Sequence, residues 1–375
     1  MTEARSPHRA WLQVDHAAIR HNVSVVRGLA PGAQIIGVVK ANAYGHGDVA
    51  VARTLVSAGV ERLAVATVDE AARLREAGIR APILLLWGIG PAEAEEAVRL
   101  DLEPIVYDLR SVELLEAAAP GAARVSVHLK VATGLARQGS TPEEAPELAA
   151  RIVRSPRLRL AGTMSHLAVA GEDDAYTDVQ LLRLARALDA MRSSGIDPGL
   201  VHMSATGGIL AGASSGADAV RPGLALFGLM PAWAAGRDVG LRPALSLRAL
   251  PLRLFDLAPG APVGYGLRFR AERPTRIATL GIGYGDGWPR SHANNGWALV
   301  RGHRVPIVGA VSMDGITVDI GEVPGVTYDD EFVLIGEQGG ARITAEDVAG
   351  ERRTINYEVT TALRERLPRL HLGAD

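Results

Sequence analysis

Hydrophobic residues follow two different rhythms along this 375-residue chain. Between about residues 33 and 230, short β-branched or apolar runs alternate with Ala- and Leu-rich helical stretches, which is the pattern of βα units in a parallel sheet. Eight such runs predict an α/β fold of the TIM (β/α)8 barrel type, because a doubly wound sheet would place a GxGxxG loop after its first strand and this chain has none there. The expected strands are Gln34–Lys40, Leu63–Thr67, Ile83–Trp87, Pro104–Tyr107, Val125–Val131, Leu160–His166, Val201–Ser204 and Ala219–Phe227.

Two helix starts are indicated by capping residues. Thr141 is followed by Pro142 and by Glu144 three positions on, so we expect a cap with a proline at the first helical position. Thr177 and Gln180 have the spacing of a second capping box.

After Pro231 the rhythm changes, because Leu241 to Ile335 alternates apolar and polar residues without a long helical stretch. This pattern predicts a mainly β C-terminal domain with a hairpin formed by Ala298–Arg301 and Val305–Val308. A linker is expected near residues 231–241. We therefore predict a barrel domain over 1–235 and a β domain over 236–375, with the strand near residues 11–15 packing against the second.

Composition narrows the class of function. Apolar residues make up 47% of the chain, charged residues 22%, and the formal net charge is −2, so neither nucleic acid nor a membrane is expected as partner. The absence of cysteine excludes thiolate catalysis and disulfides, and no metal site is assigned. No signal-peptide pattern is found at the amino terminus. We expect a cytoplasmic protein that acts on a small molecule.

Lys40 ends the first expected barrel strand, at the edge where barrel enzymes keep their chemistry. An amine partly removed from water there has a lowered pKa, which favours the neutral form that Schiff-base chemistry needs. The alternative, a lysine whose ammonium reaches past the strand end into solvent, stays open on this residue alone.

The residues around Lys40 read Val38-Val39-Lys40-Ala41-Asn42-Ala43-Tyr44-Gly45-His46-Gly47. This segment resembles the pyridoxal 5'-phosphate (PLP) attachment motif of the alanine racemase family, and the resemblance extends over nearly the whole chain. It implies that Lys40 carries PLP as a Schiff base and that Tyr44 hydrogen-bonds the cofactor phosphate.

Further cofactor contacts follow from the resemblance. The segment from Arg221 to Gly228 is similar to the family's RPG-x-ALYG, which implies that Arg221 faces the pyridine nitrogen and leaves it unprotonated. Thr206, with the amides of Gly223 and Leu224, is then expected at the phosphate. Ala205 stands where the family usually has asparagine.

Residues 130–139 resemble the family's K-x-D-T-G-M-x-R-x-G. The match implies that Arg137 binds the substrate carboxylate and that Lys130 is carbamylated. Ala132 replaces the usual aspartate. His166 matches a histidine that links Arg221 to a tyrosine base, although an isolated histidine in a strand is more often a core residue.

The second base is implied by Val263-Gly264-Tyr265-Gly266, which is similar to the family's V-S-Y-G. Racemisation needs a proton carrier on each side of Cα, and Lys40 and Tyr265 would supply them. Tyrosine has a pKa of about 10, so positive charge nearby must help it ionise.

Other matches in the β domain imply that the Met313 amide meets the substrate carboxylate, that Tyr357 contacts phosphate and that Tyr284 lines the entrance. Ala310 replaces a usual arginine. In this family the β domain of one subunit completes the barrel site of the other, which implies a homodimer with composite active sites.

The resemblance therefore implies a racemase that interconverts L- and D-alanine for cell-wall precursors. One alternative is a relative in specialised metabolism that acts on serine or another amino acid. It stays open because Ala132, Ala205 and Ala310 are smaller than the residues that the family usually has at these positions. A barrel-type PLP decarboxylase is a second alternative, although that class usually relies on a cysteine near the substrate. A PLP carrier, a third, would lack the β domain.

Overall fold

The computed structural model describes residues 8–119, 124–214 and 216–374. These residues form two compact units. The barrel unit comprises Ile19–Tyr44 and Asp48–Arg242. The β unit comprises Pro243–Ala374 together with residues up to Ala18 and the short stretch Gly45–Gly47.

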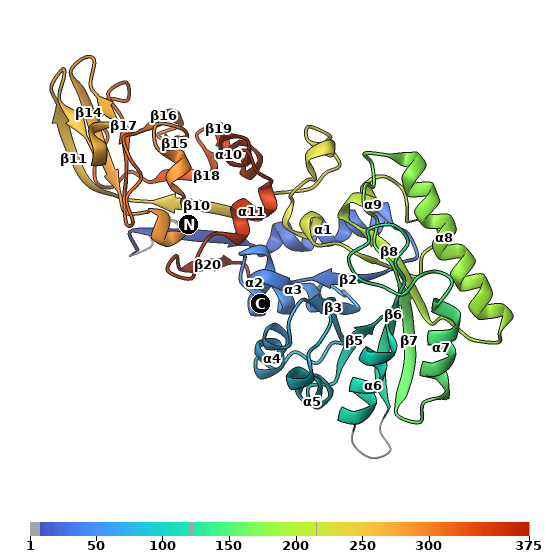
Figure 1. The fold of residues 1–375 in the computed structure, drawn as a ribbon. Helices are drawn as coiled ribbons and strands as arrows, with labels where there is room; N and C mark the ends of the chain where they lie inside the picture. The colour runs from blue at the N-terminus through green and yellow to red at the C-terminus, as the bar shows by residue number, and fades with distance from the viewer. Residues whose placement is uncertain (1–7, 120–123, 215, 375) are drawn as a thin grey trace. The chain divides into compact units, whose positions relative to one another are not determined.

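A closed barrel of eight parallel strands forms the barrel unit, with each strand beside the next in chain order and the last beside the first (Figure 1). This confirms the fold predicted from the sequence, with strand ends that differ by a few residues. The strands are β2 (Gln34–Val38), β3 (Arg62–Val65), β4 (Ile83–Leu85), β5 (Leu102–Val106), β6 (Val125–Lys130), β7 (Leu158–Met164), β8 (Leu200–Ala205) and β9 (Ala219–Arg221).

The last barrel strand is shorter than predicted. We expected a strand over Ala219–Phe227, but β9 ends at Arg221 and a 3-10 helix, η1, covers Leu224–Phe227. Pro222 explains the end of the strand, because it has no N–H to continue the ladder. The carbonyl of Pro222 still accepts a hydrogen bond from the Val38 amide of β2, at 3.0 Å.

Helices surround the barrel, and their apolar faces pack on the outward side chains of the strands. One buried cluster joins Val127, Leu129 and Val131 to Leu148 and Leu184 of the outer helices. The helices are α1 (His16–Leu29), α2 (Lys40–Tyr44), α3 (Asp48–Ser57), α4 (Val68–Glu76), α5 (Pro91–Arg99), α6 (Leu109–Ala118), α7 (Ala145–Arg154), α8 (Asp174–Ser193), α9 (Thr206–Leu210) and the 3-10 turn η2 (Ala232–Ala234).

Both predicted helix starts need correction. Thr141 and Glu144 do exchange reciprocal hydrogen bonds, but they close a turn and α7 begins only at Ala145. Thr177 and Gln180 lie inside α8, whose cap is Asp173. The side chain of Gln180 instead binds the Ala168 amide and the His166 carbonyl. Gln180 therefore makes a tertiary contact and does not cap a helix.

The β unit is built on a ten-stranded sheet. Its strands follow the order β11-β14-β17-β16-β15-β18-β10-β1-β20, with β19 paired to β18. They are β1 (Ala10–Asp15), β10 (Leu245–Ala249), β11 (Pro251–Leu257), β14 (Thr275–Leu280), β15 (Trp297–Val300), β16 (His303–Val308), β17 (Ile316–Asp319), β18 (Phe332–Gln338), β19 (Ala341–Ile343) and β20 (Arg369–Leu372).

The predicted hairpin is confirmed as β15 and β16, which pair antiparallel around the Arg301–Gly302 turn. Strand β1 pairs antiparallel with β10 and parallel with β20, so the first strand of the chain lies in the sheet of the β unit. The remaining short elements are β12 (Pro262–Val263), β13 (Phe269–Arg270), η3 (Tyr265–Leu267), η4 (Tyr284–Asp286), η5 (Arg290–His292), α10 (Ala345–Arg352) and α11 (Asn356–Thr361).

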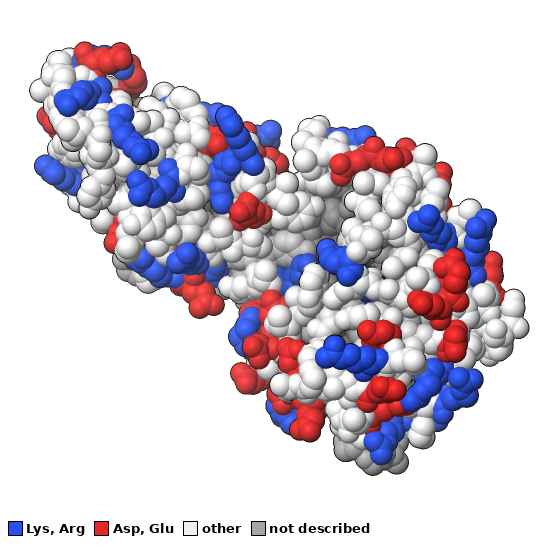
Figure 2. Space-filling model, in the orientation of Figure 1, with Lys and Arg blue, Asp and Glu red and all other residues white. Residues whose placement is uncertain are grey.

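Acidic and basic side chains are interspersed on the face of each unit drawn in Figure 2. Such a mixed surface fits the net charge of −2 and gives no broad basic area on that face for a polyanion. Among the residues described, no helix is both long and apolar enough to cross a membrane.

Candidate active site

A left-handed turn follows directly on the first barrel strand and fixes the position of Lys40. The four residues after the lysine, Ala41 to Tyr44, have φ between 50° and 55°, although none of them is glycine. Each such residue costs roughly 1 to 2 kcal/mol, so the surrounding structure must hold the turn in place. Glu70 contributes by accepting a hydrogen bond from the Ala41 amide at 2.6 Å, and Asn42 accepts one from the Asp48 amide. Strain of this kind gathers at functional sites.

The environment of Lys40 lowers its pKa. Burial is the largest cause, the positive charge of Arg137 adds to it, and the carboxylate of Glu70 opposes it. The lysine amine is therefore easier to deprotonate than one in water, as the sequence predicted from its place at a strand end.

A second lysine lies at the end of β6, and these two are the only lysines in the chain. Lys130 is 4% exposed. Burial, together with the charges of Arg137, Arg221 and Lys40, lowers its pKa to about 8. Its Nζ donates a hydrogen bond to Oε1 of Gln138 at 3.2 Å. The barrel edge thus concentrates four cationic side chains, which favours an anion among them.

Arg137 is exposed and its guanidinium stacks over the indole ring of Trp87, 5.1 Å from the ring centre. The sequence analysis did not assign Trp87 a role. Trp87 lies two residues beyond β4, at the same edge of the barrel, so its ring can hold the guanidinium of Arg137. Position 132, where an aspartate was expected from the resemblance, is Ala132 and offers no carboxylate to do so.

Arg221 is buried at the end of β9 and is held by several groups. Its Nη2 donates to the carbonyls of Ser165 and Met203, at 2.7 and 3.0 Å, and lies 3.1 Å from Nδ1 of His166. Its Nη1 lies 2.7 Å from Nδ1 of His202. Burial lowers the pKa of Arg221 to about 9. The predicted neighbours Arg221 and His166 are therefore in contact.

Burial, followed by the charges of Arg221, Arg137, Lys130 and Lys40, lowers the pKa of His166 to about 3. His166 is consequently neutral at physiological pH and can accept a hydrogen bond from Arg221.

Residues expected at a phosphate gather at the ends of β8 and β9. A Cβ at Gly223 would lie 2.3 Å from the hydroxyl oxygen of Tyr44, so only glycine lets this tyrosine approach the turn. The Tyr44 ring also packs at 5.3 Å from the ring of Phe227. The hydroxyl of Thr206 accepts a hydrogen bond from the Ala225 amide at 3.1 Å, next to Leu224 in the same turn. Tyr44 and Thr206 thus both lie against the turn of Gly223 and Leu224, within the barrel unit.

In the β unit, Tyr265 is 75% exposed, on the short η3 turn. Gly264, with φ of 75°, brings this turn against residue 310, where a Cβ on the glycine would lie 3.2 Å from the Ala310 nitrogen. A large side chain in place of Ala310 would start beside the tyrosine turn.

The segment that follows Ala310 contains Met313 and binds the turn that carries Tyr284. The Tyr284 amide donates to the Ser312 carbonyl, and the Gly285 amide donates to the Met313 carbonyl. Buried Asp286 closes the η4 turn by accepting from the Gly283 amide and pairing with Arg9. Met313 is 52% exposed, whereas Tyr357, on α11, is half-buried.

The sequence analysis missed His202 and Glu70. His202 is completely buried in β8 and contacts Arg221, and the alternation along Val201-His202-Met203-Ser204 could have placed it on the inward face. Glu70 closes the cap of α4 with Thr67, so its sequence signal was that of a helix start.

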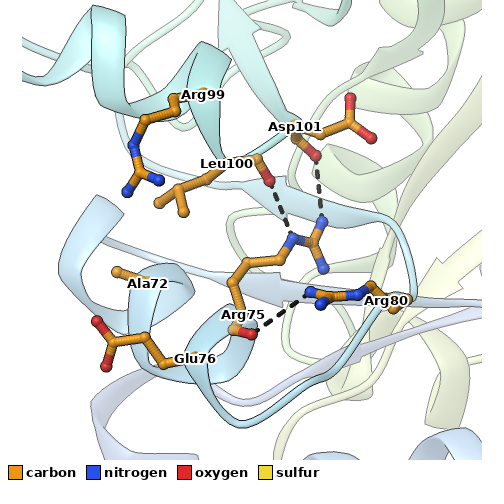
Figure 3. A pocket seen from close by; sticks show the side chains of 7 residues that line it. All are labelled: Ala72, Arg75, Glu76, Arg80, Arg99, Leu100 and Asp101. Atoms are coloured by element: carbon orange, nitrogen blue, oxygen red, sulfur yellow. Dashed lines mark hydrogen bonds between the residues drawn. The ribbon is translucent and has the colours of Figure 1, made fainter.

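A surface pocket of about 410 Å³ lies elsewhere on the barrel, between α4 and α5 (Figure 3). Its central residue, Arg75, donates to the carbonyls of Ile79, Ala81, Leu100 and Asp101, so the guanidinium serves to hold the loops. None of the predicted site residues lines this pocket. Within the described part of the chain, no three His, Asp or Glu side chains are grouped to bind a metal ion.

Sequence comparisons cover both units. The alanine racemase N-terminal domain matches residues 14–231, and the alanine racemase C-terminal domain matches residues 244–371. An alanine racemase of Syntrophobacter fumaroxidans is 40% identical, over 97% of this chain and 98% of that protein. An alanine racemase of Sorangium cellulosum is 42% identical, over 97% and 99%.

Solved structures agree with the sequence comparisons. Alanine racemase from the D-cycloserine producer Streptomyces lavendulae matches with a TM-score of 0.92 and 35% identity, over 98% of both chains. Alanine racemase from Bacillus anthracis, solved with bound L-Ala-P, matches with a TM-score of 0.90 and 34% identity, over 98% of this chain and 96% of that one. With both domain models matched and full-length relatives this similar, the chain belongs to the alanine racemase family.

Proposed function

We propose that this chain is a PLP-dependent racemase that interconverts L- and D-alanine. The observation that carries the proposal is Lys40, an amine with a lowered pKa, at the carboxyl edge of a barrel beside Lys130, Arg137 and Arg221. This arrangement suits a cofactor that combines an aldehyde with a dianionic phosphate.

The residues present fit PLP. Lys40 would bind its aldehyde, while Tyr44 and Thr206, with the amides of Gly223 and Leu224, would hold its phosphate. The close approach of the Tyr44 hydroxyl to Gly223 supports this assignment, because it places the hydroxyl beside the turn that would supply the two amides. Tyr357 is proposed as a further phosphate contact.

When bound, PLP withdraws electrons from Cα of the amino acid and makes the α-hydrogen acidic. Arg221 would face the pyridine nitrogen as a donor, and a guanidinium does not transfer a proton at ordinary pH. By leaving the ring nitrogen without a proton, Arg221 would favour return of the proton to Cα over transamination. Arg137 would bind the substrate carboxylate through its guanidinium.

Lys40 would move the proton on one side of Cα and Tyr265 on the other. Tyr265 is 75% exposed within its own chain, and Met313 is 52% exposed. A tyrosine in water has a pKa of about 10 and is therefore a poor base at neutral pH. To act as a base, Tyr265 needs a surrounding that is shielded from water and positively charged. We propose that a second copy of the chain provides it, with Tyr265, Met313 and the entrance residue Tyr284 completing the partner's site in a homodimer.

Supply of D-alanine for cell-wall precursors and a cytoplasmic location belong to the same proposal. Both follow from the family resemblance and from the role proposed for the site.

The activity is tested by incubating purified, PLP-loaded protein with a panel of L-amino acids that includes alanine and serine. Chiral chromatography should detect D-alanine as the main product. Faster conversion of L-serine than of L-alanine would overturn the substrate assignment, and no conversion of any amino acid would overturn the racemase.

The composite site is tested by mixing two inactive variants, Lys40→Ala and Tyr265→Ala. Half of the dimers formed after subunit exchange are mixed, and each mixed dimer contains one intact site of two, so about a quarter of wild-type activity should return. If both residues of a site came from one chain, mixing would restore nothing.

A further inference from the structure

A line of buried polar side chains crosses the interior of the barrel from the amino ends of the strands to Arg221. At the amino end, Arg62 of β3 pairs with Glu103 of β5, with 3.4 Å between Nε and Oε2. The same carboxylate oxygen lies 3.3 Å from Nε2 of His128 in β6. Nδ1 of His128 lies 2.9 Å from Nε2 of His202 in β8, and Nδ1 of His202 lies 2.7 Å from Nη1 of Arg221.

The direction of these hydrogen bonds is fixed at both ends. Arg221 has donors and no acceptor, so Nδ1 of His202 must accept. Burial and the charges of Arg221 and Arg62 lower the pKa of His202 well below its usual value, so the ring is neutral and its proton sits on Nε2. His202 then donates to Nδ1 of His128. Because that nitrogen accepts, the proton of the His128 ring sits on Nε2, facing the Glu103 carboxylate.

The Glu103 carboxylate stays ionised in this position. Burial alone would raise its pKa, but the hydrogen bond from Nε2 of His128 and the charge and hydrogen bond of Arg62 lower the pKa below its usual value. Glu103 therefore acts as an acceptor for the whole line, and one reversal of a ring proton anywhere along it would place two donors or two acceptors face to face.

The barrel is shaped to admit this line. His128 and His202 have no exposed surface, Arg221 is 3% exposed and Glu103 is 8% exposed. Gly162 of β7 leaves room for the imidazole, because a Cβ there would lie 2.5 Å from Nδ1 of His128. A buried donor without an acceptor is costly, so each contact constrains the next.

We infer that Glu103 is a positioning residue for Arg221. Acting through His128 and His202, its carboxylate reinforces the tautomer that accepts from the guanidinium, and it places a negative charge at the far end of the line. The inference rests on the proposed function, in which Arg221 faces the cofactor ring. Glu103 touches neither the cofactor nor the substrate in this scheme.

Two substitutions separate the acceptor from the charge. Glu103→Leu removes both, so the proton on Nε2 of His128 loses its acceptor. Only the contact of His202 with Arg221 then opposes the reversed tautomers. Glu103→Gln keeps an oxygen that accepts from His128 but removes the charge. The control is Glu116→Gln, a carboxylate on α6 that pairs with Arg151 and does not belong to the line.

Nitrogen-15 solid-state spectra of histidine- and arginine-labelled holoenzyme report the tautomers directly. The wild-type and Glu116→Gln proteins should show His128 and His202 as neutral rings protonated at Nε2. Glu103→Leu should add a second tautomer at both residues. Glu103→Gln should keep the tautomers yet shift the guanidinium signals of Arg221, because a polarised line transmits the change.

Racemisation kinetics give the functional readout on the same preparations. Glu103→Leu should lower kcat roughly 5- to 100-fold, the range expected when a buried donor loses its partner, with KM for alanine unchanged. Glu103→Gln should fall between that variant and wild type. A KM change without a kcat change would contradict a role through Arg221.

Wild-type tautomers and wild-type kcat in Glu103→Leu would overturn the inference. If that variant fails to fold, unshifted Arg221 signals in Glu103→Gln would overturn it instead. If the wild-type protein racemises no amino acid, the proposed function fails, whereas the spectra still decide whether Glu103 sets the two tautomers.

Discussion

The guanidinium of Arg221 and the imidazole of His166 face each other across 3.1 Å, with Nη2 of the arginine aimed at Nδ1 of the histidine. Burial, together with the positive charge of Arg221 so close to the ring, lowers the pKa of His166 to about 3 and keeps the histidine neutral. The pair therefore combines a fixed charge with a residue that accepts a hydrogen bond.

This pair predicts a contribution to acid sensitivity. The unfolded state binds a proton at His166 below pH 6.5, while the folded state does not until about pH 3, so the residue destabilises the fold increasingly as pH falls through that window. The free energy of unfolding of His166→Gln should consequently fall less than that of wild type between pH 7 and pH 5. Urea unfolding at both pH values measures it.

His303→Gln, a change at an exposed histidine of the β16 strand, is the control and should follow the wild-type curve. Equal losses in wild type and His166→Gln would contradict the neutral state of the buried ring.

Lys40 is predicted to be the site of covalent attachment. Borohydride should bleach the yellow holoenzyme and fix a pyridoxyl group on Lys40, and peptide mapping is simple because Lys130 is the only other lysine. Lys40→Ala should fold but show no racemisation, since both the attachment point and one proton carrier are gone. A pyridoxyl group found on Lys130 would refute the assignment.

The sequence predicted the barrel well because its signals are repetitive. Strands such as Ile83–Leu85 are apolar on both faces, as parallel strands covered by helices must be, and eight of them left little choice of architecture. The strand end and the motif that follows it together singled out Lys40, whose role in the site stays a prediction. Thr177 and Gln180 misled the analysis, because the capping pattern says nothing about a side chain that binds the Ala168 amide across the fold.

Contacts between distant strands could not be predicted in the same way. Glu103 and His128 sit in strands whose register sets whether they meet, and the register of β5 and β6 was not readable from either segment. The partners of His202 and Trp87 could not be predicted either, because each contacts an arginine from a different part of the barrel. Such contacts depend on closure of the barrel.

Lys130 is predicted to react with carbon dioxide. Its pKa of about 8 leaves a substantial neutral fraction near pH 8, and the neighbouring Arg137 and Arg221 stabilise the anion that forms. Holoenzyme equilibrated with 13C-bicarbonate should show one carbamate carbon signal, absent from Lys130→Ala. Activity lost in Lys130→Ala should partly return with acetate.

If the carbamate signal remained in Lys130→Ala and disappeared in Lys40→Ala, the carbamate would be on Lys40 and the prediction would be wrong. A crystal structure with an unmodified Lys130 ammonium would also contradict the prediction.

The last prediction concerns the separate duties of the two bases. Tyr265→Ala leaves Lys40 in place, so substrate should still bind and Lys40 should still exchange the α-hydrogen on its own side of Cα. The family resemblance gives Lys40 the hydrogen of D-alanine and Tyr265 that of L-alanine. In deuterated water the variant should exchange D-alanine and release it as D-alanine, while exchange from L-alanine falls by about 10² to 10⁴-fold, the usual contribution of a general base. Tyr328→Phe is the matched control, because Tyr328 is an exposed tyrosine of the same unit whose hydroxyl binds only the Leu254 amide among the contacts described. Proton NMR of the α-position follows both reactions. Equal residual exchange from both enantiomers in Tyr265→Ala would mean that one base, or water, serves both sides of Cα, and the two-base scheme would have to be abandoned.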